Sequence, residues 1–288
     1  MAWQTTRFQI NLDRPRVMGI VNVTPDSFSD GGHYANTGSA IAHCERLVAE
    51  GADILDIGGE SSRPGASTLT ADEEWSRLAP VLQAALTMAV PVSVDTCKPE
   101  VMRRALDIGV DIINDIHAFR SAESMAVITA TATGAGLCAM HMRGDAATMH
   151  QLTGYVDVVA EVSSFLAERA LALRVAGIAA ERIVLDPGYG FAKTTAQNFE
   201  LLNRQSELLH LGYPLLVGWS RKRSLGDVVG RPVDQRLSAS LAAGLLALVR
   251  GAAVLRVHDV AATVDAVKVF QATTKPWDGS EPGAQGVS

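Results

Sequence analysis

The chain has 288 residues, of which 48% are apolar and 19% charged, and its formal net charge is −6 at pH 7. A chain of this length and composition can bury about three quarters of the surface that it exposes when unfolded, which excludes disorder as its main character. The acidic balance excludes a non-specific nucleic-acid binder, and no apolar stretch reaches the roughly 20 residues that a membrane span requires.

Short apolar segments typical of β-strands alternate along the chain with Ala- and Leu-rich segments typical of helices. In chain order, the predicted strands cover residues 17–23, 54–57, 92–94, 112–114, 136–140, 183–185, 215–217 and 254–257. The predicted helices cover residues 39–50, 71–89, 99–108, 122–133, 157–176, 196–211, 237–250 and 260–271. The residues before Val17 form an extra N-terminal segment, which we expect to be a short hairpin over the bottom of the barrel described next.

Eight strands, each followed by a helix, predict an α/β fold of the (β/α)8 TIM barrel class. The strands are short and continuously apolar, as parallel strands covered on both faces are. A doubly wound open sheet is the alternative, but its glycine-rich turn after the first strand is missing. We expect a single barrel domain over residues 1–275 and a disordered tail over residues 276–288, which are rich in Gly, Pro and Ser.

Every predicted strand leads into at least one polar side chain, and in a barrel these strand ends meet at the rim that carries the chemistry. Any one of these residues could simply cap the following helix, but eight strand ends together favour a site. The polar residues are Asn22, Asp56, Asp95, Asn114, Asp115, His141, Asp186, Ser220, Arg221, Lys222, Arg256 and His258.

Two chemical characters are present on this rim. Asp95, Asn114 and Asp186 can accept hydrogen bonds from the N–H edge of a flat heterocycle. A basic set suits a phosphate, and the loops after strands seven and eight are the usual phosphate site of a barrel. The basic set consists of Arg63, Lys222, Arg256 and His258. The residues therefore predict a flat, nitrogen-rich substrate that carries a phosphate or pyrophosphate.

Two segments rich in Gly, Ser and Pro, residues 24–36 and 58–66, follow the first two strands. They are either solvated connectors or lids that close over the substrate and exclude water.

Eight segments, in family order, resemble the dihydropteroate synthase family. They are MGIVNVTPDSFSDGG (18–32), DIGGESSRPGA (56–66), VSVDT (92–96), IINDI (112–116), HMRG (141–144), LDPGYGF (185–191), GWSRK (218–222) and RVHDV (256–260). The resemblance implies a barrel that transfers the pterin-methyl group of 6-hydroxymethyl-7,8-dihydropterin pyrophosphate to p-aminobenzoate, with Mg²⁺ assisting. It also implies a homodimer, for which helices 237–250 and 260–271 are the candidate interface, and a pocket that sulfonamide drugs imitating p-aminobenzoate can enter.

The resemblance assigns roles to individual residues. The catalytic set would be Asp30, Arg63, Asp95, Asp186 and Lys222. The pterin would be bound by Ile20, Asp95, Asn114, Ile116, Met140, Asp186, Phe191, Gly218, Lys222 and Arg256. The pyrophosphate would be held by Asn22, Arg63, Arg256 and His258, with Asn22 also contributing to Mg²⁺. The p-aminobenzoate would be lined by Phe28, Ser62, Pro64, Phe191 and Ser220.

The chain departs from the family pattern at two positions. Ser62 stands where many members have Thr, and Arg223 stands where some have Ser. Arg223 either pairs with the p-aminobenzoate carboxylate or points to solvent. Two other functions stay open at this point: a pterin-binding methyltransferase barrel and a catalytically silent pterin-binding homologue.

The compartment is predicted from the cysteines and the N-terminal segment. Cys44, Cys97 and Cys138 are far apart and form no metal-binding or disulfide pattern. Residues 1–16 contain no apolar run of the kind that a signal peptide has. We therefore expect a cytoplasmic protein with reduced thiols.

Overall fold

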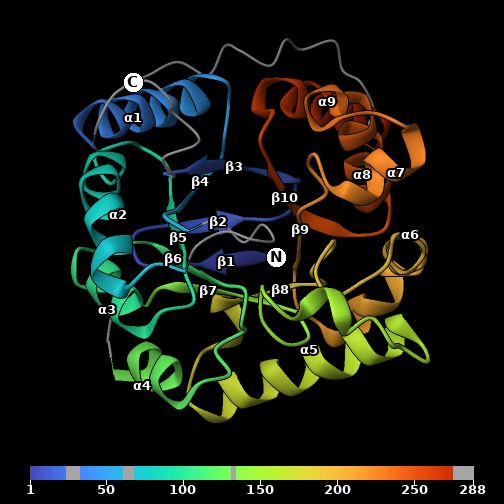
Figure 1. The fold of residues 1–288 in the computed structure, drawn as a ribbon, viewed down its shortest axis with the longest axis horizontal. Helices are drawn as coiled ribbons and strands as arrows, with labels where there is room; N and C mark the ends of the chain where they lie inside the picture. Colours follow the sequence, from blue (N-terminus) through green and yellow to red (C-terminus); the bar gives the residue numbers. More distant parts are fainter. Residues whose placement is uncertain (24–32, 61–67, 131–133, 275–288) are drawn as a thin grey trace.

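The computed structural model describes residues 1–23, 33–60, 68–130 and 134–274. Parallel strands close into a barrel in the order β10-β3-β4-β5-β6-β7-β8-β9, and helices surround it (Figure 1). The barrel strands are β3 (Arg16–Asn22), β4 (Ile54–Gly58), β5 (Val92–Asp95), β6 (Ile112–Asp115), β7 (Gly136–Met140), β8 (Ile183–Asp186), β9 (Leu215–Val217) and β10 (Ala252–Val257). The α-helices are α1 (His33–Ala49), α2 (Ala71–Ala85), α3 (Pro99–Asp107), α4 (Ala122–Ala130), α5 (Val158–Val175), α6 (Thr195–Asn203), α7 (Arg223–Val229), α8 (Leu237–Val249) and α9 (Val260–Thr274). The predicted (β/α)8 class is confirmed.

The alternation of side chains along each strand explains how the strand ends build one polar rim. In β4, Leu55 and Ile57 pack outward into the large core shared with the helices, whereas Ile54 belongs to a second cluster inside the barrel. Asp56, which has the same parity as Ile54, therefore points inward. The same parity turns Asp95, Asn114 and Asp186 toward the barrel axis, because each follows an inward residue two positions earlier on its strand.

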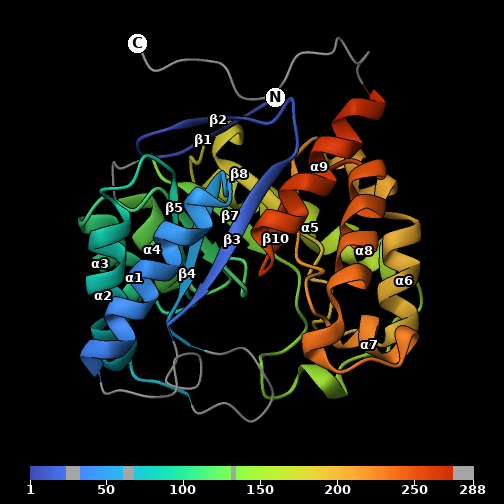
Figure 2. The same ribbon diagram turned by 90° about the horizontal axis from the view of Figure 1, so that it is seen from above.

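The predicted N-terminal hairpin is also confirmed. Strands β1 (Ala2–Gln4) and β2 (Gln9–Asn11) pair antiparallel and lie at one end of the barrel (Figure 2). Trp3 and Ile10 of the hairpin pack onto the inward residues at the lower end of the barrel, and Trp3 Nε1 donates to the carbonyl of Arg182 at 3.0 Å. This end is closed by apolar packing, so the open end for chemistry is the opposite rim.

The largest differences from the predicted helices are in three places. Helix α7 was not predicted, because its seven residues include Gly226, a poor helix former, and its cap residue Lys222 makes no side-chain capping hydrogen bond. The helix predicted over residues 196–211 divides into α6 and a 3₁₀ segment, Gln205–Leu211. Helix α1 begins at His33, six residues before the predicted start.

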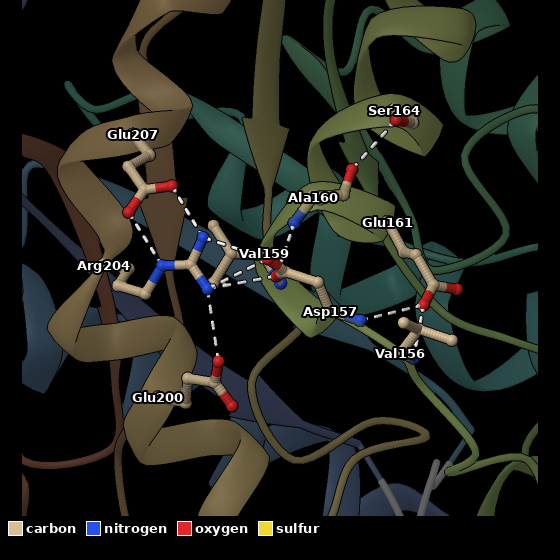
Figure 3. Close-up of polar contacts among 9 residues, drawn as sticks. All are labelled: Val156, Asp157, Val159, Ala160, Glu161, Ser164, Glu200, Arg204 and Glu207. Atoms are coloured by element: carbon tan, nitrogen blue, oxygen red, sulfur yellow. Dashed lines mark hydrogen bonds and ion pairs between the residues drawn. The ribbon is translucent and has the colours of Figure 1, made fainter.

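A surface ion-pair network joins the helices that follow β7 and β8 (Figure 3). Asp157 caps the start of α5 by accepting from the backbone N–H groups of Val159 and Ala160. Arg204, just after α6, lies 3.1 Å from Asp157 Oδ1 and 2.8 Å from Glu207 Oε1. The network therefore joins the start of α5 to the end of α6.

The outer surface of α8 is unusual for an exposed helix. It carries no charged residue from Leu237 to Val249, and Leu246 and Val249 are 46% and 67% exposed. On the neighbouring α9, Val269 is 66% exposed. Among the described residues, none of the helices has both the length and the apolar character needed to cross a membrane.

Candidate functional site

A pocket opens at the carboxyl ends of the barrel strands and encloses about 390 Å³ of empty space, part of it open to solvent. It is lined by Asp95, Asn114, Ile116, Met140, Asp186, Tyr189, Phe191, Gly218, Lys222 and Arg256. Apart from Tyr189, each of these residues was assigned to pterin recognition from the sequence. Tyr189 is buried, and its hydroxyl donates to Gln205 Oε1 at 2.9 Å. It was not predicted, because the sequence pattern does not distinguish a pocket tyrosine from a core tyrosine.

Three hydrogen-bond acceptors line the pocket: Asp95, Asn114 and Asp186. Asn114 donates through Nδ2 to Asp56 Oδ2 at 3.3 Å, which leaves its amide oxygen as the accepting group. Asp186 Oδ1 accepts from the backbone N–H of Gly188 at 2.7 Å. Burial raises the pKa of Asp95 to about 7 and that of Asp186 to about 6, because the charged carboxylate is costly to desolvate.

Arg256 joins two carboxylates across the mouth of the barrel. Its Nε lies 2.6 Å from Asp56 Oδ2, and its Nη2 lies 2.6 Å from Asp95 Oδ2. Burial alone would lower the pKa of Arg256, but Asp56 and Asp95 outweigh it and hold the guanidinium charged. Asp56 is fully buried, and its Oδ1 has no hydrogen-bond partner within the described residues. The sequence placed these residues on one rim but did not predict that they form an ion-pair bridge.

Lys222, which follows β9, also lines the pocket and lies above an aromatic ring. Its ammonium nitrogen is 4.1 Å from the centre of the Phe191 ring, a cation–π distance. Burial, reinforced by the charge of Arg256, lowers the pKa of Lys222 to about 8. Arg236 donates to the carbonyl of Arg221 at 3.1 Å and thereby holds the turn before α7 that presents Lys222.

Ser220 and His258 contact each other beside the pocket. Ser220 Oγ lies 2.9 Å from His258 Nδ1, and it also accepts from the backbone N–H of His258 at 3.1 Å. Burial, followed by the nearby Arg256 and Arg221, lowers the pKa of His258 to about 3. This lowering favours the neutral form of His258 at pH 7, in which the ring takes part in hydrogen bonds rather than carrying a charge.

The remaining predicted residues lie outside the pocket lining or outside the described ranges. Ile20 is buried on β3, and the half-buried Asn22 ends that strand. Ser220 also lines a separate cavity of about 330 Å³ between α8 and α9. The side chain of Arg223 is 88% exposed. Residues outside the described ranges are Phe28, Asp30, Ser62, Arg63 and Pro64.

One residue of the predicted rim, His141, points away from the pocket. It is 2% exposed, packs edge-on against Phe165, and places Nδ1 2.9 Å from the ammonium of Lys193. Burial and the charge of Lys193 lower the pKa of His141 to about 2. The side chain turns outward, toward α5, because it follows the pocket-lining Met140 with the opposite parity. Lys193 itself was missed, since a lysine after a strand loop is usually solvated.

Among the described residues, no group of three or more His, Cys, Asp or Glu side chains could hold a metal ion. Mg²⁺ does not require such a group, because it usually takes one or two protein oxygens and completes its shell with water and substrate phosphates. Oxygens of that kind are present on β3 and β4: the amide oxygen of Asn22, and Oδ1 of Asp56, which has no hydrogen-bond partner among the described residues.

Comparisons with known proteins agree on one family. A family model described as "Pterin binding enzyme" matches residues 18–258. A dihydropteroate synthase of Neisseria meningitidis serogroup B is 48% identical over 277 residues, which cover 94% of this chain and 97% of the relative. A Xanthomonas albilineans dihydropteroate synthase solved with 4-aminobenzoic acid has a TM-score of 0.89 and 49% identity, covering 95% of this chain and 99% of that one. The same organism's enzyme in complex with 7,8-dihydropteroate has a TM-score of 0.85 and 47% identity, covering 94% and 98%.

Proposed function

Because the chain belongs to the pterin-binding enzymes and, among them, to the dihydropteroate synthases, we propose how its own residues carry out that reaction. The pterin-methyl group of 6-hydroxymethyl-7,8-dihydropterin pyrophosphate is transferred to the amine of p-aminobenzoate, and 7,8-dihydropteroate and pyrophosphate are released. The observation that carries the assignment of sites is the rim pocket, which brings acceptors, a cation and an aromatic wall together around a space for a flat ring.

The pterin is proposed to bind with its N–H edge toward Asp95, Asn114 and Asp186. These groups can accept hydrogen bonds from an amine and ring N–H groups, and such bonds to ionised carboxylates are about twice as strong as neutral ones. Ile116, Met140 and Phe191 form the apolar walls, with the buried Ile20 beneath them. Lys222 donates to an acceptor on the ring from its place above Phe191.

The pyrophosphate is proposed to bind beside the pterin, at Asn22, Arg63, Arg256 and His258. Arg256 lies at the boundary between the two subsites, and its bridge to Asp56 and Asp95 fixes the direction of its guanidinium. His258, being neutral, contributes a hydrogen bond rather than a charge.

Asn22 on β3 and Asp56 on the neighbouring β4 fit Mg²⁺ as oxygen donors, because Oδ1 of Asp56 is a buried acceptor that has no donor among the described residues. When bound, the ion would neutralise charge on the leaving pyrophosphate. The chain's own contribution is the cationic side chain of Arg256 and the directed donors around it.

The second substrate, p-aminobenzoate, is proposed to enter next to Phe191 and Ser220, together with Phe28, Ser62 and Pro64. Phe191 supports this position because it already lines the pocket, with Lys222 against its ring. The exposure of Arg223 favours the solvent orientation over a pair with the p-aminobenzoate carboxylate.

The displacement is proposed to be dissociative. The C–O bond to pyrophosphate breaks first, and the pair of electrons leaves with the pyrophosphate. The pterin ring delocalises the positive charge of the methylene carbon, and the carboxylates of Asp95 and Asp186 stabilise that charge. The amine then attacks and loses a proton afterwards, so little general-base work is required. Asp30 and Arg63 complete the proposed catalytic set. Positional isotope exchange tests this step: scrambling of the bridging oxygen without p-aminobenzoate is expected, and its absence where exchange is detectable would contradict the order of steps.

The proposed quaternary state is a homodimer formed through α8, with α9 beside it. A second copy of the chain is the occupant that suits an apolar helix face carrying exposed Leu246 and Val249 without a charge. A cytoplasmic location is proposed because all three cysteines are free thiols.

Turnover tests the proposed function directly. Purified protein is incubated with the pterin pyrophosphate, p-aminobenzoate and Mg²⁺, and dihydropteroate is measured. A folded protein that binds the pterin and forms no product would instead be a silent homologue, and one that consumes methyltetrahydrofolate would be a methyltransferase.

A further inference from the structure

The ammonium of Lys193 joins the loops that follow two neighbouring barrel strands. Lys193 is 8% exposed and lies just beyond β8. Its Nζ donates to the carbonyls of Gly188 at 2.9 Å and Phe191 at 3.1 Å, and it lies 2.9 Å from His141 Nδ1. His141 directly follows β7, so a single side chain ties the end of β7 to the turn after β8.

The turn after β8 that Lys193 contacts is closely packed and has backbone conformations that favour glycine. Gly188 has φ of +68°, and a Cβ there would lie 1.9 Å from the carbonyl oxygen of His141. Gly190 has φ of +80°, and a Cβ there would lie 2.9 Å from Lys222 Cδ. Ala192, with φ of +50°, is a third residue of this turn in the left-handed region. The Gly188 carbonyl accepts from the backbone N–H of Phe191 at 3.1 Å as well as from Lys193, and Lys193 is also the donor to the Phe191 carbonyl.

Three pocket residues depend on the tied segments. Met140 directly precedes His141. Gly188 accepts from Lys193 through its carbonyl, and it donates through its N–H to Asp186 Oδ1 at 2.7 Å. Phe191 presents its carbonyl to Lys193 and its ring to Lys222. We propose that Lys193 is a positioning residue for the pterin pocket: without touching the substrate, it sets Met140, Asp186 and Phe191 relative to one another. This inference rests on the proposed pterin site.

The charge of Lys193 also acts on Asp186. The groups that face Asp186 are the N–H of Gly188, Lys222, Arg256 and Lys193, and each of them opposes the rise in the pKa of Asp186 that burial causes. Burial, offset by Asp186 and reinforced by Lys222 and Arg143, lowers the pKa of Lys193 to about 7. Removal of Lys193 therefore raises the pKa of Asp186 as well as loosening the turn.

The test replaces Lys193 by Met, which has a similar length and no donor, with Lys193→Gln as a second variant that keeps two donors without charge. The matched control is Arg182→Met at the opposite end of β8. Arg182 is also a half-buried cation that ties β8 to the start of β7, through a hydrogen bond to the carbonyl of Ala135 at 2.7 Å. All variants are assayed for binding of 6-hydroxymethyl-7,8-dihydropterin by calorimetry across pH 5–9, for steady-state kinetics with both substrates, and for melting temperature.

Lys193→Met is expected to raise the Kd of the pterin at least tenfold. It should also raise KM for the pterin pyrophosphate more than KM for p-aminobenzoate. The pH below which pterin affinity is lost should be higher than in wild type. Lys193→Gln is expected to fall between Met and wild type, which keeps the test available if Lys193→Met does not fold. Arg182→Met is expected to lower the melting temperature while leaving the pterin Kd within twofold. The positioning role would be overturned if Lys193→Met or Lys193→Gln kept the pterin Kd and pH profile of wild type while Asp186→Asn bound the pterin more weakly. Normal binding in Asp186→Asn as well would instead overturn the proposed pterin site.

Discussion

The guanidinium of Arg256 donates from Nε to Oδ2 of Asp56 at 2.6 Å, and the Asp56 carboxylate that accepts this bond is fully buried. Strands β4 and β10, which carry the two residues, are separated in the barrel by β3. The bond therefore reaches past β3 inside the barrel rather than joining neighbouring strands. Because a buried charge is costly without its partner, this contact is both a part of the site and a part of the stability of the rim.

Asp56→Asn is expected to lower the free energy of unfolding by about 3 kcal/mol, since the substitution leaves Arg256 partly unpaired in a buried position. Urea denaturation measures the change. The matched control is Asp107→Asn, which removes a carboxylate from an exposed i,i+4 pair with Arg103 and should change stability by less than about 0.5 kcal/mol. Equal effects of the two substitutions would contradict a buried ion pair at the barrel mouth.

Lys222→Met is expected to lower activity without lowering stability, whereas Arg256→Met is expected to lower both. Burial lowers the pKa of Lys222 to about 8, which means that the folded protein disfavours the charged ammonium. Replacing Lys222 should therefore lower the melting temperature little, while activity should fall on the order of 100-fold. Arg256→Met should cost activity and also lower the melting temperature, because Asp56 and Asp95 lose their shared cation. Turnover and thermal melts of both variants measure this. A destabilised Lys222→Met with retained turnover would reverse the assignment.

Asp186→Asn is expected to stabilise the ligand-free protein and to weaken pterin binding. The folded protein holds the pKa of Asp186 at about 6, above its ordinary 3.8, so the stability associated with this group is fully present below about pH 4 and is lost as pH rises to about 6. At pH 8 the variant should therefore be more stable by on the order of 2 kcal/mol. The Kd of the pterin should rise about 10- to 100-fold through the lost charge-assisted bond. The prediction would be contradicted if the difference in free energy of unfolding between wild type and Asp186→Asn moved in favour of wild type as the pH rises from 4 to 6.

Leu246→Glu is expected to convert the proposed dimer to a monomer, because a charge is placed on the apolar face of α8. Light scattering after size-exclusion chromatography measures the mass. Val175→Glu on α5, where the side chain is 80% exposed, is the control for a charge added at an exposed apolar residue elsewhere. A wild-type protein that is monomeric at micromolar concentration, or a dimer that Leu246→Glu leaves intact, would exclude α8 as the interface.

Sequence reasoning predicted the barrel because each strand is a continuous apolar run and each ends in a polar residue. That pattern also predicted Asp95, Asn114, Asp186 and Lys222 on one rim, where the structure places them around one pocket. Helix α7 was not predictable from periodicity, because seven residues show less than two full periods of a helix. The orientation of His141 and the burial of Lys193 depend on contacts between β7, α5 and the turn after β8, which no local pattern encodes.

The most direct measurement of the central claim is the rate at which wild type and Asp186→Asn form dihydropteroate and pyrophosphate from the pterin pyrophosphate, p-aminobenzoate and Mg²⁺. Asp186 is chosen because it touches the proposed pterin and because its replacement should not unfold the protein. Product formation by wild type, with a higher KM for the pterin pyrophosphate in the well-folded variant, is the expected result. No dihydropteroate from folded wild type, or equal KM values for the two proteins, would contradict the account.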